Sequence, residues 1–90
     1  MKYSVKNTVK DKATKGQTAL LFDSCTGTLY EINLTAYEIF KILKAEPKTA
    51  EAVCDELRRK YSAEKAEIEN DVKESIEYML TVKVLEPVNE

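Results

Sequence analysis

Apolar and polar residues alternate in the first third of the chain, which is typical of short strands. Residues 2–10 alternate loosely and predict an edge strand. Residues 18–23 hold a short apolar run, and residues 28–32 are rich in β-branched and aromatic side chains, so both predict strands. The segment Asp23-Ser-Cys-Thr-Gly27 between them has turn chemistry, because Asp and Ser bond their own backbone and Gly27 tolerates a positive φ. These two strands are expected to form a hairpin, and the polar residues 11–17 are expected to form a loop.

A helical period replaces the alternation in the rest of the chain. Apolar residues at this period predict helices over residues 36–44, 50–61 and 64–81. Thr49 and Ser62 precede the second and third helices, where a hydroxyl can accept a hydrogen bond from a free backbone amide. The third helix is expected to pack one apolar stripe on the core, made of Ile68, Val72, Ile76, Met79 and Leu80.

Almost no loop separates the strand over residues 28–32 from the first helix. Thr35 and Glu38 have the spacing of a capping box, in which each side chain bonds the backbone amide of the other residue. Leu34 and Ile39 flank this pair at the spacing of a hydrophobic staple. Together these contacts are expected to fix the angle between strand and helix.

The order of the elements predicts a small α+β domain over residues 1–90. Its expected architecture is winged-helix-like, with an N-terminal three-stranded antiparallel sheet followed by three helices. Residues 82–85 predict a short final strand, which Pro87 is expected to end.

The charge of the chain argues against a nucleic-acid partner. The net charge is −2, and acidic residues dominate the last third, although five lysines make the first 15 residues basic. A protein that binds duplex DNA normally gathers a basic excess on one face. No nucleic acid is therefore expected as a partner.

The residue types present also argue against catalysis. The sequence has no histidine, two cysteines and two glycines, which removes Ser-His and Cys-His arrangements and phosphate-cradling glycine loops and argues against a zinc site. Cys25 is expected to be a bystander in a turn and Cys54 to lie in the core. We expect no catalytic residue, no metal and no cofactor. No apolar run approaches the roughly 20 residues of a membrane span, so a soluble, cytoplasmic protein is expected.

Several motifs follow one another in a recognisable order: Gly27-x-x-Tyr30-x-Ile32-Asn33-x-Thr35-Ala36-x-x-Ile39, Thr49 with Val53-x-x-x-Leu57, Asp71-Val72-x-x-x-Ile76-x-x-Met79, and Val84-Leu85. Over roughly residues 18–86 they resemble the relatives of the D protein of pyrroloquinoline quinone biosynthesis, a PqqD-like family of RiPP recognition elements. The sequence departs from the family at Ala45-Glu46 in place of Asp-Gly, at Ser75 in place of an aromatic residue, and at Lys83 in place of glycine. These departures favour a relative over the quinone-pathway protein itself.

The resemblance implies a non-catalytic peptide-binding protein. Members of this family bind the leader segment of a ribosomally made precursor peptide and deliver it to a modifying enzyme, often a radical SAM enzyme. The leader adds as a strand beside residues 28–32 and lies in the groove between that strand and the helix over residues 64–81. The peptide-binding residues implied here are Thr28, Leu29, Tyr30, Glu31, Ile32, Asp71, Ser75 and Tyr78.

Other interpretations of these residues remain open. Either Leu29 or Tyr30 would form the groove floor, and Tyr30 and Ile32 are more typical of core positions than of ligand contacts. Asp71 is more often a solvated helix charge than a ligand contact. The opposite flank of the third helix, with Glu69, Lys73 and Leu80, is the alternative groove wall.

Two other functions compete with peptide delivery. A winged-helix DNA-binding regulator would insert the third helix into the major groove, but that helix carries six carboxylates against two lysines. A structural subunit would form a homodimer through the same strand edge.

Overall fold

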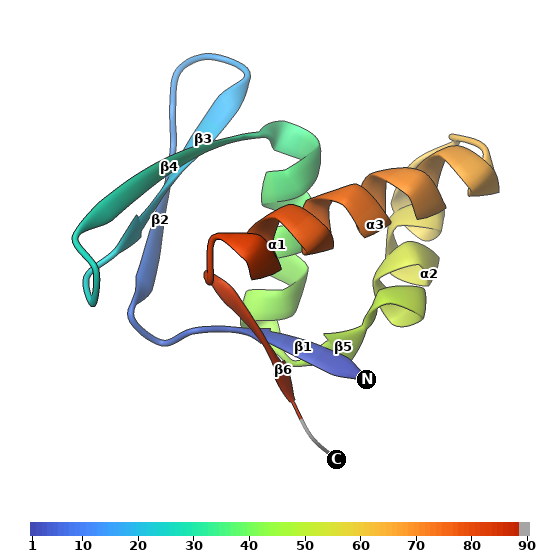
Figure 1. The fold of residues 1–90 in the computed structure, drawn as a ribbon. Helices are drawn as coiled ribbons and strands as arrows, with labels where there is room; N and C mark the ends of the chain where they lie inside the picture. The colour runs from blue at the N-terminus through green and yellow to red at the C-terminus, as the bar shows by residue number, and fades with distance from the viewer. Residues whose placement is uncertain (89–90) are drawn as a thin grey trace.

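The computed structural model describes residues 1–88, and its α+β class confirms the expected fold (Figure 1). The elements in chain order are β1 (Lys2–Val5), β2 (Val9–Ala13), β3 (Thr18–Asp23), β4 (Thr28–Asn33), α1 (Leu34–Ala45), β5 (Lys48–Thr49), α2 (Ala50–Lys60), α3 (Lys65–Thr81) and β6 (Leu85–Val88). Within residues 1–88, no helix combines the length and the apolarity that crossing a membrane requires.

The strands form two antiparallel sheets of three strands each. One sheet has the order β2-β3-β4 and stands to one side of the helices, as Figure 1 shows. The other has the order β5-β1-β6 and joins the two ends of the described chain to the turn between α1 and α2. The predicted three-stranded sheet is therefore confirmed in β2-β3-β4, and the second sheet is an addition to it.

The prediction of one strand over residues 2–10 is wrong. Residues Lys2–Val5 pair with β5 and β6, whereas Val9–Ala13 pair with β3 in the other sheet. The predicted loop over residues 11–17 begins only after Ala13. The strand β2 was not predicted because Asp11 lies on its inner side, opposite Leu21. An apolar residue at this position would have continued the alternation.

Asp11 is instead held by two polar partners on α1. Its carboxylate accepts hydrogen bonds from the Tyr37 hydroxyl at 2.7 Å and from the Lys44 ammonium group. Burial raises the pKa of Asp11, but the hydrogen bonds from Lys44 and Tyr37 and the charge of Lys44 outweigh burial and hold the pKa below its usual value. The hydrogen bond that the Tyr37 hydroxyl donates to Asp11, together with burial, raises the pKa of Tyr37. These contacts join the first sheet to α1.

We expect Asp11 to make the stability of the fold depend on pH in the acid range. Because the pKa of Asp11 is lower in the folded than in the unfolded state, its contribution is complete above the unfolded-state pKa of about 4 and is lost as the pH falls through the folded-state value. Urea unfolding at several pH values should therefore show wild type and Asp11→Asn differing most near neutral pH and converging as the pH falls below the folded-state pKa of Asp11. If the difference in unfolding free energy between the two proteins stays constant across this range, Asp11 does not cause the loss of stability in acid.

The joint between β4 and α1 is capped by Asn33. The Asn33 side-chain oxygen accepts a hydrogen bond from the Ala36 amide at 2.8 Å, and α1 begins at Leu34. The predicted capping box of Thr35 and Glu38 is wrong, because Thr35 already lies inside the first helical turn. The predicted staple is also wrong, since the Leu34 side chain is 41 % exposed while Ile39 is buried.

The remaining helix and strand ends confirm some predictions and correct others. Thr49 caps α2 by accepting from the Ala52 amide at 3.1 Å, as predicted. The predicted Ser62 cap is wrong: Glu64 precedes α3 and makes no side-chain cap bond. Pro87 lies inside β6 rather than ending it, which an edge strand permits. Lys83 takes a left-handed backbone with φ of 65°, the conformation that glycine adopts most easily.

The core lies between the inner side of the first sheet and the three helices. The largest fully buried apolar side chains are Phe40, Leu21, Ile39, Leu43, Met79, Val53, Val72 and Val84. The predicted stripe of α3 is confirmed as buried at four positions, with Leu80 partly buried beside it. Cys54 lies in this core, as predicted, and burial raises the pKa of its thiol.

Candidate functional site

The outer edge of β4 is the candidate site. In the order β2-β3-β4, β4 pairs with β3 on one side, and within residues 1–88 no strand pairs with its other edge. A cleft of about 250 Å³ lies beside this edge, between β4, the start of α1 and α3. Its lining residues are Glu31, Ile32, Asn33, Ala36, Glu74, Ser75 and Tyr78. An unpaired strand edge beside a helix presents the backbone groups that a further strand needs.

The register of the hairpin decides which way each β4 side chain points. Thr28, Tyr30 and Ile32 lie opposite Asp23, Leu21 and Ala19, which are the buried residues of β3. Leu29 and Glu31 lie on the other side of the sheet, and Leu29 is 59 % exposed. The interpretation of Tyr30 and Ile32 as core residues is confirmed, because Ile32 is buried and Tyr30 packs against the core.

Tyr30 also fixes the distance between β4 and the end of α3. Its hydroxyl donates a hydrogen bond to the backbone oxygen of Val82, the residue that follows the last residue of α3, at 3.2 Å. This contact joins positions 52 residues apart in the sequence. Tyr30 therefore helps to hold α3, one wall of the cleft, at a fixed distance from β4.

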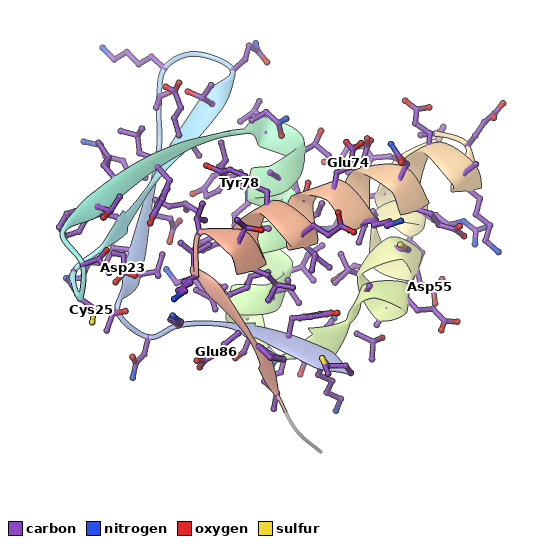
Figure 2. The ribbon with its side chains drawn as sticks, in the orientation of Figure 1. Asp23, Cys25, Asp55, Glu74, Tyr78 and Glu86 are labelled. Carbon is purple, nitrogen blue, oxygen red and sulfur yellow. The ribbon has the colours of Figure 1, made fainter. Side chains whose placement is uncertain are left out.

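The hairpin that carries β4 is anchored at its turn by Asp23. This buried carboxylate accepts hydrogen bonds from the Thr8 hydroxyl at 3.0 Å and the Cys25 amide at 2.9 Å. Gly27 closes the turn with a φ of 73°, and its amide donates to the Asp23 backbone oxygen at 2.8 Å. Cys25 is exposed at the tip of the hairpin, away from α3 in Figure 2.

The two flanks of α3 face different surroundings. Ser75 and Tyr78 line the cleft with β4, and Figure 2 shows Tyr78 and Glu74 on the same edge of the helix. The flank with Glu69, Lys73 and Leu80 instead lines a cavity of about 430 Å³ against α2 and β1. Whether Ser75 and Tyr78 contact a peptide stays a prediction.

Asp71 lies outside the cleft, in a neighbouring pocket of about 640 Å³. We call this the α1–α3 pocket; it is lined by Ala13, Leu34, Thr35, Tyr37, Glu38, Lys41, Leu57, Tyr61, Ala63, Glu67, Ile68 and Asp71. The first turn of α1 borders both spaces, because Asn33 and Ala36 line the cleft while Leu34 and Thr35 line the pocket. The pocket thus continues the cleft toward the start of α3.

Sequence reasoning missed three cleft residues, Asn33, Ala36 and Glu74. Glu74 is one helical turn from both Asp71 and Tyr78, so helical spacing alone could have placed it on the same flank. Asn33 and Ala36 were missed because the cap of the first helix was predicted at Thr35, whereas the observed cap is Asn33.

Carboxylates dominate the charges of this surface. Glu31 and Glu74 line the cleft, and Glu67 and Asp71 line the α1–α3 pocket. The ammonium group of Lys41, which also lines the pocket, is engaged by Glu38 at 2.8 Å. Among residues 1–88, no three cysteine, aspartate or glutamate side chains converge in a way that could hold a metal ion.

Comparisons with known proteins agree with this geometry. One solved structure, TbiB1 in complex with the TbiA(beta) leader peptide, superposes with a TM-score of 0.77 at 18 % identity, covering 97 % of this chain and 99 % of that chain. Another, lasso peptide synthetase B1 complexed with the leader peptide, gives a TM-score of 0.74 at 19 % identity, covering 94 % and 98 %. At these identities the likeness establishes a shared fold. No curated protein sequence matches the chain significantly.

The family comparison goes further, because it covers most of the chain. Residues 18–85 match the model of the family described as Coenzyme PQQ synthesis protein D (PqqD). The matched segment begins with β3 and ends with the first residue of β6, so it includes both walls of the cleft. The chain belongs to the PqqD family.

Proposed function

We propose that this chain binds the leader segment of a ribosomally made precursor peptide and delivers it to a modifying enzyme of the radical SAM class. The leader adds as a fourth strand to the outer edge of β4, in the cleft between β4 and α3. The chain performs no reaction itself and acts in the cytoplasm, where ribosomal precursors are made.

The unpaired edge of β4 beside the cleft carries this proposal. A peptide that joins a sheet gains affinity from backbone hydrogen bonds and specificity from pockets for alternate side chains. The edge supplies the backbone groups, and Ser75 and Tyr78 form the facing wall. Tyr78 is 45 % exposed, so its ring is available to pack on an incoming side chain.

The two solved neighbours support the nature of the ligand. Both are complexes with leader peptides, and both share this fold over nearly their whole length. The proposal transfers that ligand class to this chain and leaves the sequence of the leader to be found.

The charges of the site make a peptide a better ligand than DNA. The α3 flank along the cleft and pocket carries Glu67, Asp71 and Glu74, which repel phosphates. A leader with basic residues complements these carboxylates, and the exposed Leu34 and Tyr61 of the α1–α3 pocket offer an apolar contact.

The direct test is the binding of a labelled synthetic leader to the purified chain. The peptide is taken from the precursor gene nearest to the gene of this chain, and fluorescence anisotropy is measured against protein concentration. We expect saturable binding in the micromolar range or tighter, and no binding of a scrambled peptide of the same composition. Equal binding of the two peptides, or binding of neither, would refute the proposal.

A further inference from the structure

The outer side of the sheet β2-β3-β4 exposes apolar side chains that the cleft does not use. The hairpin register places Phe22 directly opposite Leu29, and these side chains are 41 % and 59 % exposed. Leu20, next on the same side of β3, is half-buried. Neighbouring large apolar residues on one side of a sheet form a contiguous patch that gains free energy when another surface covers it.

Lysines border this patch along β2. Lys10 lies opposite Phe22, and Lys12 lies opposite Leu20, with both lysines exposed. A single carboxylate, Glu31, borders it on β4. We call this surface the outer sheet face; it consists of Lys10, Lys12, Leu20, Phe22, Leu29 and Glu31. Its apolar centre and basic rim fit a partner with an apolar patch bordered by carboxylates.

The outer sheet face adjoins the place where the peptide is proposed to bind. A strand added to β4 extends the sheet, so alternate side chains of the peptide emerge beside Leu29 and Glu31. A protein that docks on this face therefore touches the chain and the held peptide at the same time.

We propose that the outer sheet face is the docking surface for the modifying enzyme. The enzyme packs an apolar patch on Phe22 and Leu29 and places carboxylates beside Lys10 and Lys12. This inference rests on the proposed function, because the continuity of the face with the bound peptide selects the enzyme that acts on that peptide.

A second copy of the chain fits this face less well. Three strands of this length span roughly 250 Å² of sheet, whereas a stable interface buries about 800 Å² on each partner. Two flat faces laid together gain little beyond that span. An enzyme that also contacts the bound peptide buries additional surface beyond the three strands.

The test separates peptide binding from enzyme binding. The labelled leader and the purified modifying enzyme encoded beside the precursor gene are titrated in turn against wild type and the variant Phe22→Thr, which changes β3 and leaves Leu29, beside the bound peptide, intact. Threonine is β-branched and suits an exposed strand position such as that of Phe22, so the fold is expected to persist. We expect the variant to raise the Kd for the enzyme at least about tenfold and to leave the Kd for the leader within about twofold.

Charge variants provide a second readout that does not touch the apolar centre. Lys12→Glu should weaken enzyme binding, and Lys15→Glu, which makes the same charge change in the loop beyond β2, should leave it unchanged. Phe22→Leu should restore most of the affinity that Phe22→Thr removes. Sedimentation of wild type should show a monomer at micromolar concentration.

Several outcomes would overturn the docking surface. These are unchanged enzyme binding by Phe22→Thr, equal effects of Lys12→Glu and Lys15→Glu, loss of leader binding in a variant that unfolds at the wild-type temperature, or a dimer that Phe22→Thr dissociates. Failure of the wild-type chain to bind any leader counts instead against the proposed function.

Discussion

Ser75→Trp should abolish most of the leader binding while leaving the fold intact, because the leader of this chain is expected to fit a cleft that has serine where relatives have an aromatic residue. Ser75 lines the cleft between α3 and β4, and its side chain is half-buried. An indole at this position occupies much of the space of about 250 Å³ beside the strand edge. Loss of even two backbone hydrogen bonds, each worth about 1 kcal/mol, raises the Kd about 30-fold. Fluorescence anisotropy with the labelled leader measures the effect.

Lys73→Trp is the matched control for this variant. It adds the same side chain to the same helix, but Lys73 lies on the flank that faces α2 and β1. Its Kd for the leader should equal that of wild type. If the two tryptophan variants bind the leader equally, or if Lys73→Trp is the weaker binder, the peptide does not lie between β4 and α3.

Leu21→Ala should destabilise the chain more than any surface change proposed above. Leu21 is fully buried on the inner side of β3, opposite Tyr30 on one neighbouring strand and Asp11 on the other. Removing its side chain leaves a cavity where the sheet meets the core, which costs about 2 to 5 kcal/mol. Domains of this size are stable by only about 5 to 15 kcal/mol. Urea or thermal unfolding should show a large loss.

Leu20→Ala tests the register behind that expectation. Leu20 is the neighbouring residue on β3 and faces the outer side of the sheet, where it is half-buried. The same change there should cost less than about 1 kcal/mol. Equal losses for the two variants would show that β3 does not present alternate residues to the core in the register described.

Local patterns in the sequence predicted the elements that local forces determine. The hairpin from β3 to β4, the positive φ of Gly27 and the cap at Thr49 depend on neighbouring residues, and all three are as predicted. The apolar stripe of α3 followed from helical spacing in the same way.

Long-range pairing was beyond these patterns. The strand β1 pairs with β5 and β6, which lie more than 40 residues away in the sequence, so no local alternation reveals the sheet that they form. Asp11 concealed β2, because its partners on α1 satisfy a carboxylate where an apolar residue was expected. Asn33 and Thr35 are both suitable cap residues, and spacing alone selected the wrong one.

In the candidate site, too, local spacing predicted some features, and long-range packing determined the others. Helical spacing placed Asp71, Ser75 and Tyr78 on one flank of α3. It could not show which of these residues face β4 and which face α1. The first turn of α1, rather than β4, lies beside Asp71, so Asp71 lines the α1–α3 pocket instead of the cleft. Leu29, expected in the peptide site, has its side chain on the outer sheet face because of the hairpin register.

Backbone amide exchange across β4 tests strand addition most directly. Hydrogen exchange is followed by NMR at single residues, with and without saturating leader. We expect slower exchange at alternate amides of Thr28–Asn33, those on the edge that β3 leaves unpaired, and no change at β2, whose outer edge is the other edge of the same sheet. Unchanged exchange at β4 under saturating leader, or protection at β2 in its place, would contradict peptide binding at this edge.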